Sequence, residues 1–224
     1  MGTSEKGATP SRRPATAGPS RWFFDVWSTF YDVPIVQRLT YRPVQDAVVA
    51  ALRGVCPRRV IDVGCGTGLL ATRLRREFPG AAVVGCDFSP GMLAQARRHP
   101  EPVAWIQGDA QRLPFRDGCA DAIVSTEAFH WFPDQRRTLE EFHRVLVPGG
   151  RALVALVNTP NEVARSIVRM GSNVVGQPFD GPTRARMRDL FEHAGFRVEA
   201  QRRVFRIPAG MLLPPVVTVG VRDR

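Results

Sequence analysis

Lysine is almost missing from this chain, because Lys6 is the only lysine and arginine supplies the rest of its 31 basic residues. With 21 acidic residues, the formal net charge is +10. Such a charge attracts anionic partners over long range, including nucleic acid and anionic membrane faces. The arginines are scattered along predicted helices, however, and they do not alternate with aromatic residues as in proteins that bind single strands. We therefore expect a preference for anionic partners but no dedicated nucleic-acid surface.

Cysteine is also scarce, and its spacing argues against two kinds of site. Cys56, Cys65, Cys86 and Cys119 form no C-x-x-C pair and have no histidine at metal-ligand spacing. Two of them fall on or beside predicted buried strands. Small apolar core residues in a reducing compartment are therefore favoured over a disulfide or a zinc site. The pattern predicts a cytoplasmic protein without a metal centre.

Long apolar runs are absent. No run reaches the ~18 residues of a membrane span, and the longest candidate, Ala209–Val221, contains two prolines. Residues 1–20 are rich in Ser, Thr, Ala, Pro and Arg and are predicted to be a disordered tail. Apolar residues make up 44% of the 224 and charged residues 23%, which is typical of a globular protein with one sizeable core. A single domain over residues 21–224 is expected.

The most informative stretch is Arg59–Leu70, which reads RVIDVGCGTGLL. An apolar run interrupted only by Asp62 precedes the loop glycines, Gly64, Gly66 and Gly68, and a helical pattern follows. This indicates a buried parallel strand, a tight turn and a helix N-terminus. Glycines let backbone N–H groups approach a ligand closely, and the helix N-terminus attracts a carboxylate or phosphate. Dinucleotide folds have G-x-G-x-x-G, whereas D-x-G-x-G-x-G places a carboxylate beside the loop, which suits a cationic ligand.

Four further segments follow at regular gaps. A second predicted strand, 81–86, ends in Asp87, where a Rossmann-like unit places its ribose-binding acid. A third, 103–107, leads into Gly108-Asp109-Ala110, and a fourth, 120–125, leads into the motif STEAFHWFP. A fifth, 152–157, follows a predicted turn at 148–150. In this order and at these gaps, residues 59–157 resemble the class I S-adenosylmethionine-dependent methyltransferases.

The resemblance implies a Rossmann-like, doubly wound α/β fold with helices on both faces. Its seven-stranded sheet would be mostly parallel, with a C-terminal antiparallel strand, and residues 196–207 and 215–221 alternate like the hairpin that would close it. The implied cofactor is S-adenosyl-L-methionine. The expected cofactor-binding residues are Tyr31, Asp62, Gly64, Cys65, Gly66, Gly68, Asp87, Phe88, Met92, Asp109, Ala110 and Thr126.

The resemblance also implies roles for several of these residues. Asp87 would bind the ribose, and Phe88 and Met92 would lie on either side of the adenine. Asp109 would accept a hydrogen bond from the adenine amino group, which a carboxylate can do because it only accepts, and the Ala110 amide would serve a ring nitrogen. Core packing for Phe88 and Met92, and a capping role for Asp109, remain open alternatives.

Two segments are predicted to border the acceptor. Residues 21–31 contain six aromatic residues, too many for an exposed helix, so residues 21–54 are expected to form N-terminal lid helices or to pack on a sheet edge. Within them Tyr31 and Asp32 match a Tyr-Asp pair that contacts the methionine end of the cofactor in the resembled family. Residues 158–182, with a short helix at 163–170, are expected to be an insertion on the substrate side.

His130 is the catalytic candidate. It follows the fourth strand, where doubly wound sheets place chemistry, and a histidine with a pKa near the working pH could take a proton from the acceptor. A packing role is the alternative. No metal cluster or hydrolase triad is apparent, which fits methyl transfer because a sulfonium is already an activated donor and positioning suffices.

The sequence therefore predicts a methyltransferase acting on a small-molecule acceptor that is aromatic, apolar or anionic. A nucleic-acid-directed methyltransferase fits the charge, but enzymes of this fold that modify bases usually carry Asn or Asp followed by Pro-Pro and an aromatic residue after the fourth strand, where this chain reads STEAFHWF. A non-catalytic protein that binds S-adenosylmethionine is a further alternative, which turnover would exclude. A dehydrogenase using NAD would share Asp87, and the glycine spacing argues against it.

Overall fold

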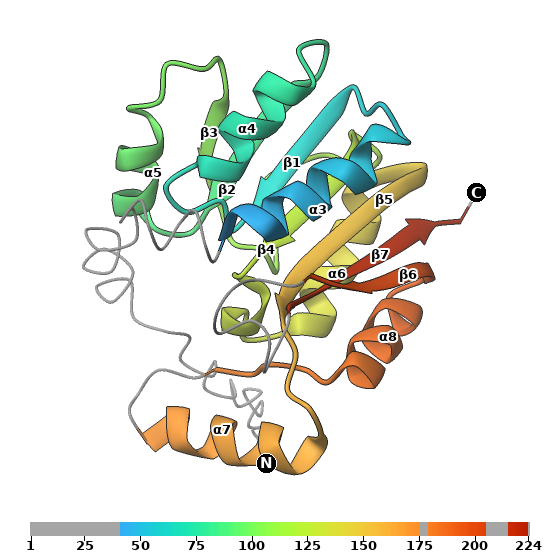
Figure 1. Ribbon diagram of the computed structural model, residues 1–224. Coiled ribbons are helices and arrows are strands. Elements are labelled where there is room, and N and C mark those ends of the chain that lie inside the picture. The colour runs from blue at the N-terminus through green and yellow to red at the C-terminus, as the bar shows by residue number, and fades with distance from the viewer. Residues whose placement is uncertain (1–40, 175–178, 205–214, 224) are drawn as a thin grey trace, which may run out of the picture.

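The computed structural model describes residues 41–174, 179–204 and 215–223 (Figure 1). Its strands form a seven-stranded sheet in the order β3-β2-β1-β4-β5-β7-β6. Their bounds are β1 Arg59–Val63, β2 Ala82–Asp87, β3 Ala104–Gln107, β4 Ala120–Thr126, β5 Leu146–Val157, β6 Phe196–Arg203 and β7 Pro215–Arg222. Neighbouring strands are parallel except at β7, which is antiparallel to both of its neighbours. The predicted fold class is confirmed.

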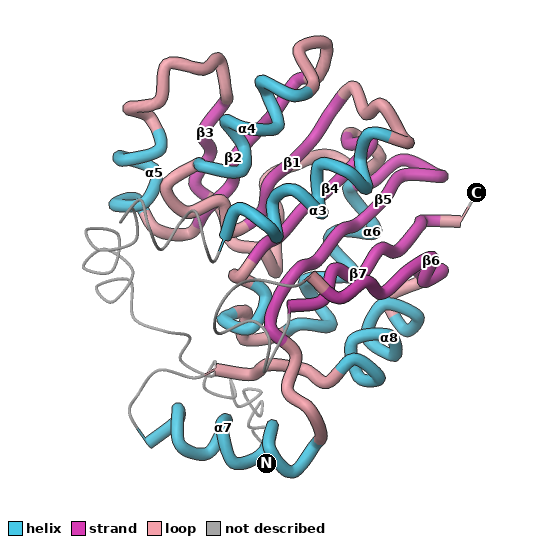
Figure 2. The backbone as a smooth tube through the Cα atoms, in the orientation of Figure 1, coloured by secondary structure: helices cyan, strands magenta, loops and turns pink. Residues whose placement is uncertain are grey.

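Helices lie on both faces of the sheet (Figure 2). Their bounds are α3 Arg42–Arg53, α4 Leu69–Glu77, α5 Pro90–Ala96, the 3-10 helix η2 Phe129–Trp131, α6 Gln135–Val145, α7 Glu162–Val174 and α8 Arg184–His193. Apolar side chains of α3 and α4 pack with one set of strand residues, and those of α6 and α8 pack with the other. This layering follows from successive right-handed crossovers between parallel strands.

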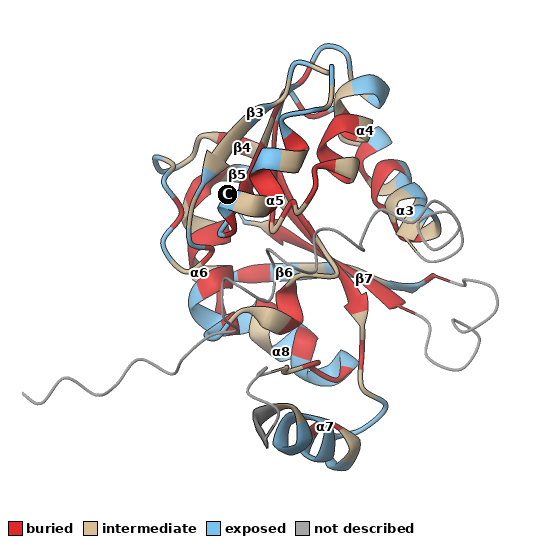
Figure 3. Cartoon of the chain, turned by 90° about the vertical axis from the view of Figure 1, so that its left-hand side faces the viewer, coloured by how far each residue is buried: buried red, intermediate tan, exposed pale blue. Residues whose placement is uncertain are grey.

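The central strands are buried on both sides, and alternate residues feed the two cores. Val60 packs with the α3 and α4 side chains, and Ile61, the next residue, packs with those of α6 and α8. Figure 3 shows buried residues running through the sheet and along the inner sides of the helices. Strands covered on both faces read as continuous apolar runs, which is why they were recognisable in the sequence.

Short-range signals fix where several helices begin. Ser89 Oγ accepts a hydrogen bond from the Met92 amide at 3.1 Å, with a proline opening α5. An Asp134 carboxylate oxygen accepts from the Arg137 amide at 2.9 Å at the start of α6. These side chains occupy donors that the first helical turn leaves unpaired.

Two segments differ from expectation. The predicted turn at 148–150 lies inside β5, where Gly149 has φ +80° and the pairing with β4 shifts register. α7 extends four residues beyond the predicted helix at 163–170. α3 begins with Pro43 in its first turn, and it packs on the sheet through Val44, Val48, Val49 and Leu52. Residues 21–40 of the predicted lid lie outside the described residues.

α7 stands apart from the sheet, beyond the carboxyl end of β5 (Figures 1 and 3). It belongs to the predicted insertion at 158–182 and reaches the rest of the domain through residues 158–161 and the segment that begins at Phe179. No helix among the described residues is long and apolar enough to cross a membrane.

Candidate functional site

The loop between β1 and α4 holds three glycines in the left-handed region, with φ of +71° at Gly64, +55° at Gly66 and +87° at Gly68. A Cβ on Gly68 would lie 2.4 Å from the Trp105 ring, and one on Gly64 would lie 2.5 Å from the Ala128 Cβ. A Cβ on Gly66 would meet nothing nearer than the Met92 Sδ at 4.0 Å. Gly64 and Gly68 are therefore required by packing, whereas Gly66 leaves its backbone open to a ligand.

Asp87, at the end of β2, holds this loop in place. One carboxylate oxygen accepts from the Gly66 amide at 2.8 Å, and the other accepts from the Ser89 amide at 2.9 Å. The carboxylate therefore sits at the edge of the sheet directly beside the glycine loop. Its predicted contact with a ribose would be made from this position.

Asp62 lies inside β1 and is fully buried. Neither of its carboxylate oxygens has a hydrogen-bond partner within the described structure. Burial, and secondarily the charge of Asp87, raise the pKa of Asp62 to about 8, and the Ala71 amide opposes this shift without meeting hydrogen-bond geometry. A buried carboxylate without a partner is unfavourable, and a cation nearby would reduce this cost. Asp62 itself is not among the residues that line the cleft beside the glycine loop, so its predicted contact with the cofactor stays a prediction.

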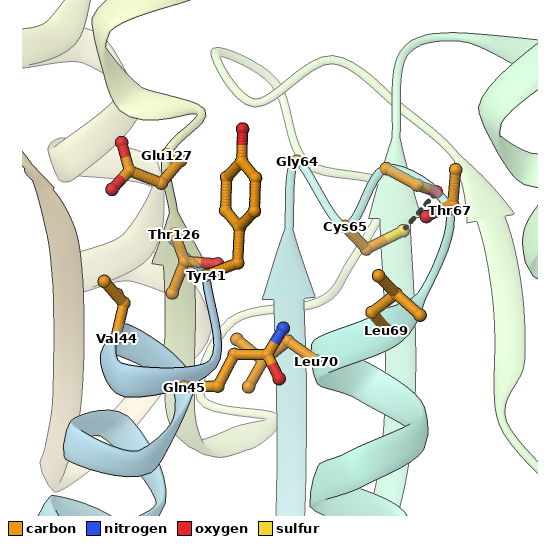
Figure 4. Close-up of a pocket in the computed structure, with 11 residues that line it drawn as sticks. Tyr41, Val44, Gln45, Gly64, Cys65, Thr67, Leu69, Leu70, Thr126 and Glu127 are labelled. Carbon is orange, nitrogen blue, oxygen red and sulfur yellow. Dashed lines mark hydrogen bonds between the residues drawn. The ribbon is translucent and has the colours of Figure 1, made fainter. Parts of the chain in front are cut away.

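A cleft opens between the glycine loop, the start of α3 and the end of β4 (Figure 4). Gly64, Cys65, Gly66 and Thr126 were predicted as cofactor-binding residues and line it. The other lining residues were not predicted; they are Tyr41, Val44, Gln45, Thr67, Leu69, Leu70 and Glu127. Burial raises the pKa of the Cys65 thiol well above its usual range, which keeps it protonated and makes it a wall residue rather than a nucleophile.

Glu127 is the residue in this cleft that sequence reasoning missed most clearly. Its φ is +53°, which is uncommon for a residue with a side chain, and its amide donates to Ala155 O at 2.8 Å. In Figure 4 Glu127 lies next to Thr126, and its carboxylate points away from the Tyr41 ring. Strained backbone of this kind is often found at functional sites. The sequence feature that could have identified Glu127 is its position as an acidic residue directly after β4.

The residues expected around the adenine lie at the same edge, beyond Asp87. Phe88 is 43% exposed, and Met92 is buried beneath the loop. Asp109 is exposed and accepts from the Gln111 amide at 2.8 Å, and Ala110 is buried. Because Asp87 pairs in register with Gln107 at the end of β3, the two loops that carry these residues are neighbours. Their roles toward an adenine stay predictions.

His130 is buried in η2 between two other rings. Its ring centroid lies 5.0 Å from that of Trp131 and 4.5 Å from that of Phe179. Burial lowers the pKa of His130 to about 3. The expectation of a pKa near the working pH is therefore wrong, because the surrounding side chains remove the water that would stabilise an imidazolium. Its catalytic role stays a prediction, and any such role would belong to the neutral imidazole.

The segment that carries Phe179 is held by polar contacts with α7. The Arg165 guanidinium donates to both carboxylate oxygens of Asp180, at 2.6 and 2.5 Å. The Asp180 amide donates to His130 O at 3.0 Å, and Gln135 Nε2 donates to Asp180 O at 2.6 Å. This chain of contacts links α7 to η2 and holds the aromatic cluster of His130, Trp131 and Phe179 together.

Two further expectations concern Tyr31 and the cysteines. Tyr31, the predicted contact for the methionine end of the cofactor, lies outside the described residues. All four cysteines are free. Within the described ranges no group of His, Cys, Asp and Glu side chains could hold a metal ion.

Comparison with known proteins places this site in a family. The methyltransferase domain matches residues 61–154. A demethylmenaquinone methyltransferase of Thermus thermophilus is 44% identical over 50% of this chain and 53% of its own length. A malonyl-[acyl-carrier protein] O-methyltransferase of Geobacter sulfurreducens is 36% identical over 69% of this chain and 62% of its own. The chain thus spans between half and two thirds of these two relatives.

A solved structure agrees over a longer range. The complex between the Haloferax volcanii Trm112 methyltransferase activator and a methyltransferase contains a chain with a TM-score of 0.70 and 27% identity, matched over 90% of this chain and 98% of the other. The domain match over residues 61–154 includes the glycine loop, Asp87 and the end of β4. These comparisons support membership of the class I S-adenosylmethionine-dependent methyltransferase family, whose cofactor is S-adenosylmethionine.

Proposed function

We propose that this protein transfers the methyl group of S-adenosylmethionine to a small-molecule acceptor in the cytoplasm. The observation that carries the proposal is the pairing of an open backbone at Gly66 with a buried, unpartnered carboxylate at Asp62. The methionine part of the cofactor is cationic, with an ammonium and a sulfonium, and it also carries a carboxylate. A glycine loop at a helix N-terminus suits the carboxylate, and an uncompensated Asp62 suits the cation.

The remaining binding roles follow from position. Asp87 is placed to accept hydrogen bonds from ribose hydroxyls while it keeps its contact with the Gly66 amide. Phe88 and Met92 flank the expected adenine position, with Asp109 and the Ala110 amide at its edge. Thr126 and Glu127 border the cleft on the β4 side. Gly64, Gly68 and Cys65 act by shaping the loop.

When bound, the cofactor supplies a methyl group already activated on a positively charged sulfur. The chain's residues then have to hold the acceptor in line with that methyl group and exclude water. Glu127 is the ionisable side chain at the cleft that could accept an acceptor proton, since the lowered pKa of His130 makes its imidazole a poor base at neutral pH. His130, Trp131 and Phe179 would form an apolar wall next to the acceptor.

The acceptor class follows from that wall and from the relatives. Aromatic side chains favour an aromatic or apolar acceptor, and the arginine excess favours an anionic one. The Thermus relative is named for a demethylmenaquinone and the Geobacter relative for a malonyl thioester on acyl-carrier protein. We therefore propose a hydroxylated aromatic or quinone-like acceptor first, and a carboxylate second.

The test is turnover with the purified chain. It is incubated with S-adenosylmethionine and a panel of phenols, hydroxyquinones and carboxylates, and methylated products are detected by mass spectrometry. We expect product with at least one aromatic hydroxyl acceptor. Calorimetry should show binding of S-adenosylhomocysteine but not of NADH, and Asp87→Ala should weaken that binding about tenfold or more, as expected when a charged hydrogen-bond acceptor is lost.

Asp189→Ala is the matched control, because Asp189 is an exposed aspartate on α8, away from the cleft. It should bind S-adenosylhomocysteine like the unmodified chain. Methylation of nucleic acid, or of cationic acceptors alone, would contradict the proposed acceptor class. Undiminished binding by Asp87→Ala would contradict the proposed binding site.

A further inference from the structure

α7 is amphipathic in an unusual direction, because its apolar side faces solvent. Val163, Ile167 and Met170 are 71%, 60% and 68% exposed. Their spacing of four and three residues places them on one face of the helix. Val168 is a further exposed apolar residue, at 43%. Figure 3 shows α7 as largely exposed, standing away from the rest of the domain.

The opposite side of α7 is polar, and it is the side attached to the protein. Arg165 is only 6% exposed, and its guanidinium binds Asp180 through two hydrogen bonds. Ser172 Oγ accepts from the Phe179 amide at 3.0 Å. In a helix that turns ~100° per residue, Arg165 lies about 200° around from both Val163 and Ile167. The apolar face therefore points away from the residues that lead to His130.

This orientation decides what could cover the apolar face. An acceptor in the cleft would approach the side of α7 that carries Arg165, so it would not touch Val163, Ile167 or Met170. Exposed apolar patches rimmed by polar residues mark interaction surfaces in soluble proteins. The occupant of this face therefore comes from outside the described domain.

The charges around α7 indicate an anionic occupant. Arg169 is exposed and forms no ion pair with any carboxylate in the described ranges. Arg184 and Arg186, at the start of α8, are also exposed. The hydrogen bond from Thr183, with smaller contributions from Arg165 and from the charge of Arg186, lowers the pKa of Glu162. Glu162, the only acid on α7, is engaged by Arg165 at 3.1 Å and by Thr183 Oγ1 at 2.8 Å. The whole chain carries a net charge of +10.

We propose that α7 docks on the surface of an anionic phospholipid bilayer. Val163, Ile167 and Met170 enter the boundary between headgroups and acyl chains. Arg169 lies about 100° around the helix from Met170, so its long exposed side chain reaches lipid phosphates from the flank of the apolar face. Apolar side chains with adjacent basic residues are the combination that holds helices in the membrane interface. α7 lies flat on the bilayer and does not cross it.

Docking would also place the cleft close to the lipid. α7 follows β5 at the same edge of the sheet as the glycine loop, so this edge turns toward the bilayer. An apolar acceptor dissolved in the membrane would then reach the cleft directly. This consequence rests on the proposed function, whereas the docking itself does not.

The experiment measures co-sedimentation of the full chain with vesicles, without cofactor, so that it is independent of methyl transfer. Vesicles of phosphatidylglycerol and phosphatidylcholine in equal parts are compared with vesicles of phosphatidylcholine alone. We expect binding to the anionic vesicles that weakens as salt is raised. Ile167→Ser combined with Met170→Ser should weaken it about tenfold or more, since two buried apolar side chains are lost.

Variants that each remove one arginine test whether Arg169 contacts the lipid. Arg169→Ser should weaken binding about fivefold, the effect of one basic residue near an anionic surface. Arg98→Ser is the matched control, because it removes the same charge from an exposed site after α5, on the other side of the domain from α7. It should bind the vesicles almost like the unmodified chain.

Several results would overturn the proposal. The unmodified chain failing to bind anionic vesicles, binding neutral vesicles equally well, or binding undiminished in the double variant would each refute it. The double variant must also unfold at the same temperature as the unmodified chain when no lipid is present. A lower unfolding temperature, or conversion of a dimer to a monomer, would show that the chain itself or a second copy covers the face.

Discussion

The two halves of the carboxyl edge of the sheet are built by different means. Around β1 and β2, backbone conformation makes the site: three left-handed glycines lie within five residues, and Asp87 pairs with the Gly66 amide. Around β5, side chains that are distant in sequence make it. Arg165 pairs with Asp180, and Asn158 Nδ2 donates to Pro182 O at 2.8 Å.

This difference separates the part of the edge that suits the cofactor from the part that is expected to contact the acceptor. The glycine side presents backbone groups and carboxylates suited to one cofactor, and few substitutions would be tolerated there. The β5 side presents an aromatic cluster and a helix that polar contacts hold in place, and such parts can change without disturbing the sheet. Cofactor binding should therefore respond to changes on the first side, and acceptor binding to changes on the second.

The largest effect is expected at Asp62. Its folded-state pKa of about 8 lies above the value near 4 of an unfolded aspartate. The folded protein therefore keeps a proton that the unfolded chain loses, and stability should fall as pH rises from about 4 to about 8. Asp62→Asn should remove this fall and should stabilise the ligand-free protein at neutral pH. The free energy of unfolding is measured by denaturant titration across this pH range. If it falls with pH as steeply in Asp62→Asn as in the unmodified chain, the raised pKa of Asp62 is contradicted.

The glycine loop allows a matched pair of substitutions. Gly68→Ala should destabilise the protein by about 3 kcal/mol, because it combines a left-handed φ with a clash against Trp105. Gly66→Ala should cost only about 1 kcal/mol, since a Cβ there has space, yet it should lose most of the cofactor affinity. Thermal unfolding and calorimetry together distinguish the two. Equal destabilisation would refute the distinction between packing and ligand contact.

The next prediction concerns the contribution of the Arg165–Asp180 ion pair to stability. Arg165→Met leaves the Asp180 carboxylate without its partner and should cost about 2 kcal/mol, less than a fully buried pair because Asp180 is partly exposed. Arg136→Met, which breaks the exposed pair with Glu140, should cost under about 0.5 kcal/mol.

Kinetics should separate the acceptor side from the cofactor side. Arg165→Met should raise the KM of the acceptor while the cofactor Kd stays unchanged, because Arg165 holds the segment of Phe179 and not the glycine loop. A weakened cofactor Kd with an unchanged acceptor KM would reverse this assignment.

The smallest effect at neutral pH is expected from the titration of His130. Its pKa of about 3 keeps the imidazole neutral throughout the range in which a free histidine titrates, near 6.5. His130→Gln should therefore leave the shape of the pH–kcat profile near that value unchanged. Because the folded pKa is lowered, the contribution of His130 to stability is lost as pH falls from about 6.5 toward 3. An inflection near 6.5 that disappears in His130→Gln would contradict the buried, neutral state.

Sequence reasoning succeeded where the signal is local. The glycine loop and the buried parallel strands depend on residues that are close in the chain and on apolar runs that few structures allow. Asp62 and Asp87 could be placed because they lie at fixed distances from the glycines. The antiparallel hairpin that ends the sheet followed from the resemblance.

The features of the site that the sequence did not predict depend on contacts between residues that are far apart in the chain. The pairing of Arg165 with Asp180 joins residues 15 apart, and the pKa of His130 depends on Phe179, which is far away in the sequence. The left-handed φ of Glu127 is imposed by its position between β4 and η2 rather than by its side chain. Tyr41 and Gln45 entered the cleft because Pro43 starts α3 where it does.

The most direct test of the account is the number of protons released when S-adenosylmethionine binds. Calorimetry at neutral pH in two buffers of different ionisation enthalpy gives this number. We expect the unmodified chain to release a proton on binding, because Asp62 must ionise to pair with the cationic ligand, and Asp62→Asn to bind more weakly and release none. Tight binding without proton release in the unmodified chain, or the same release in Asp62→Asn, would contradict the account.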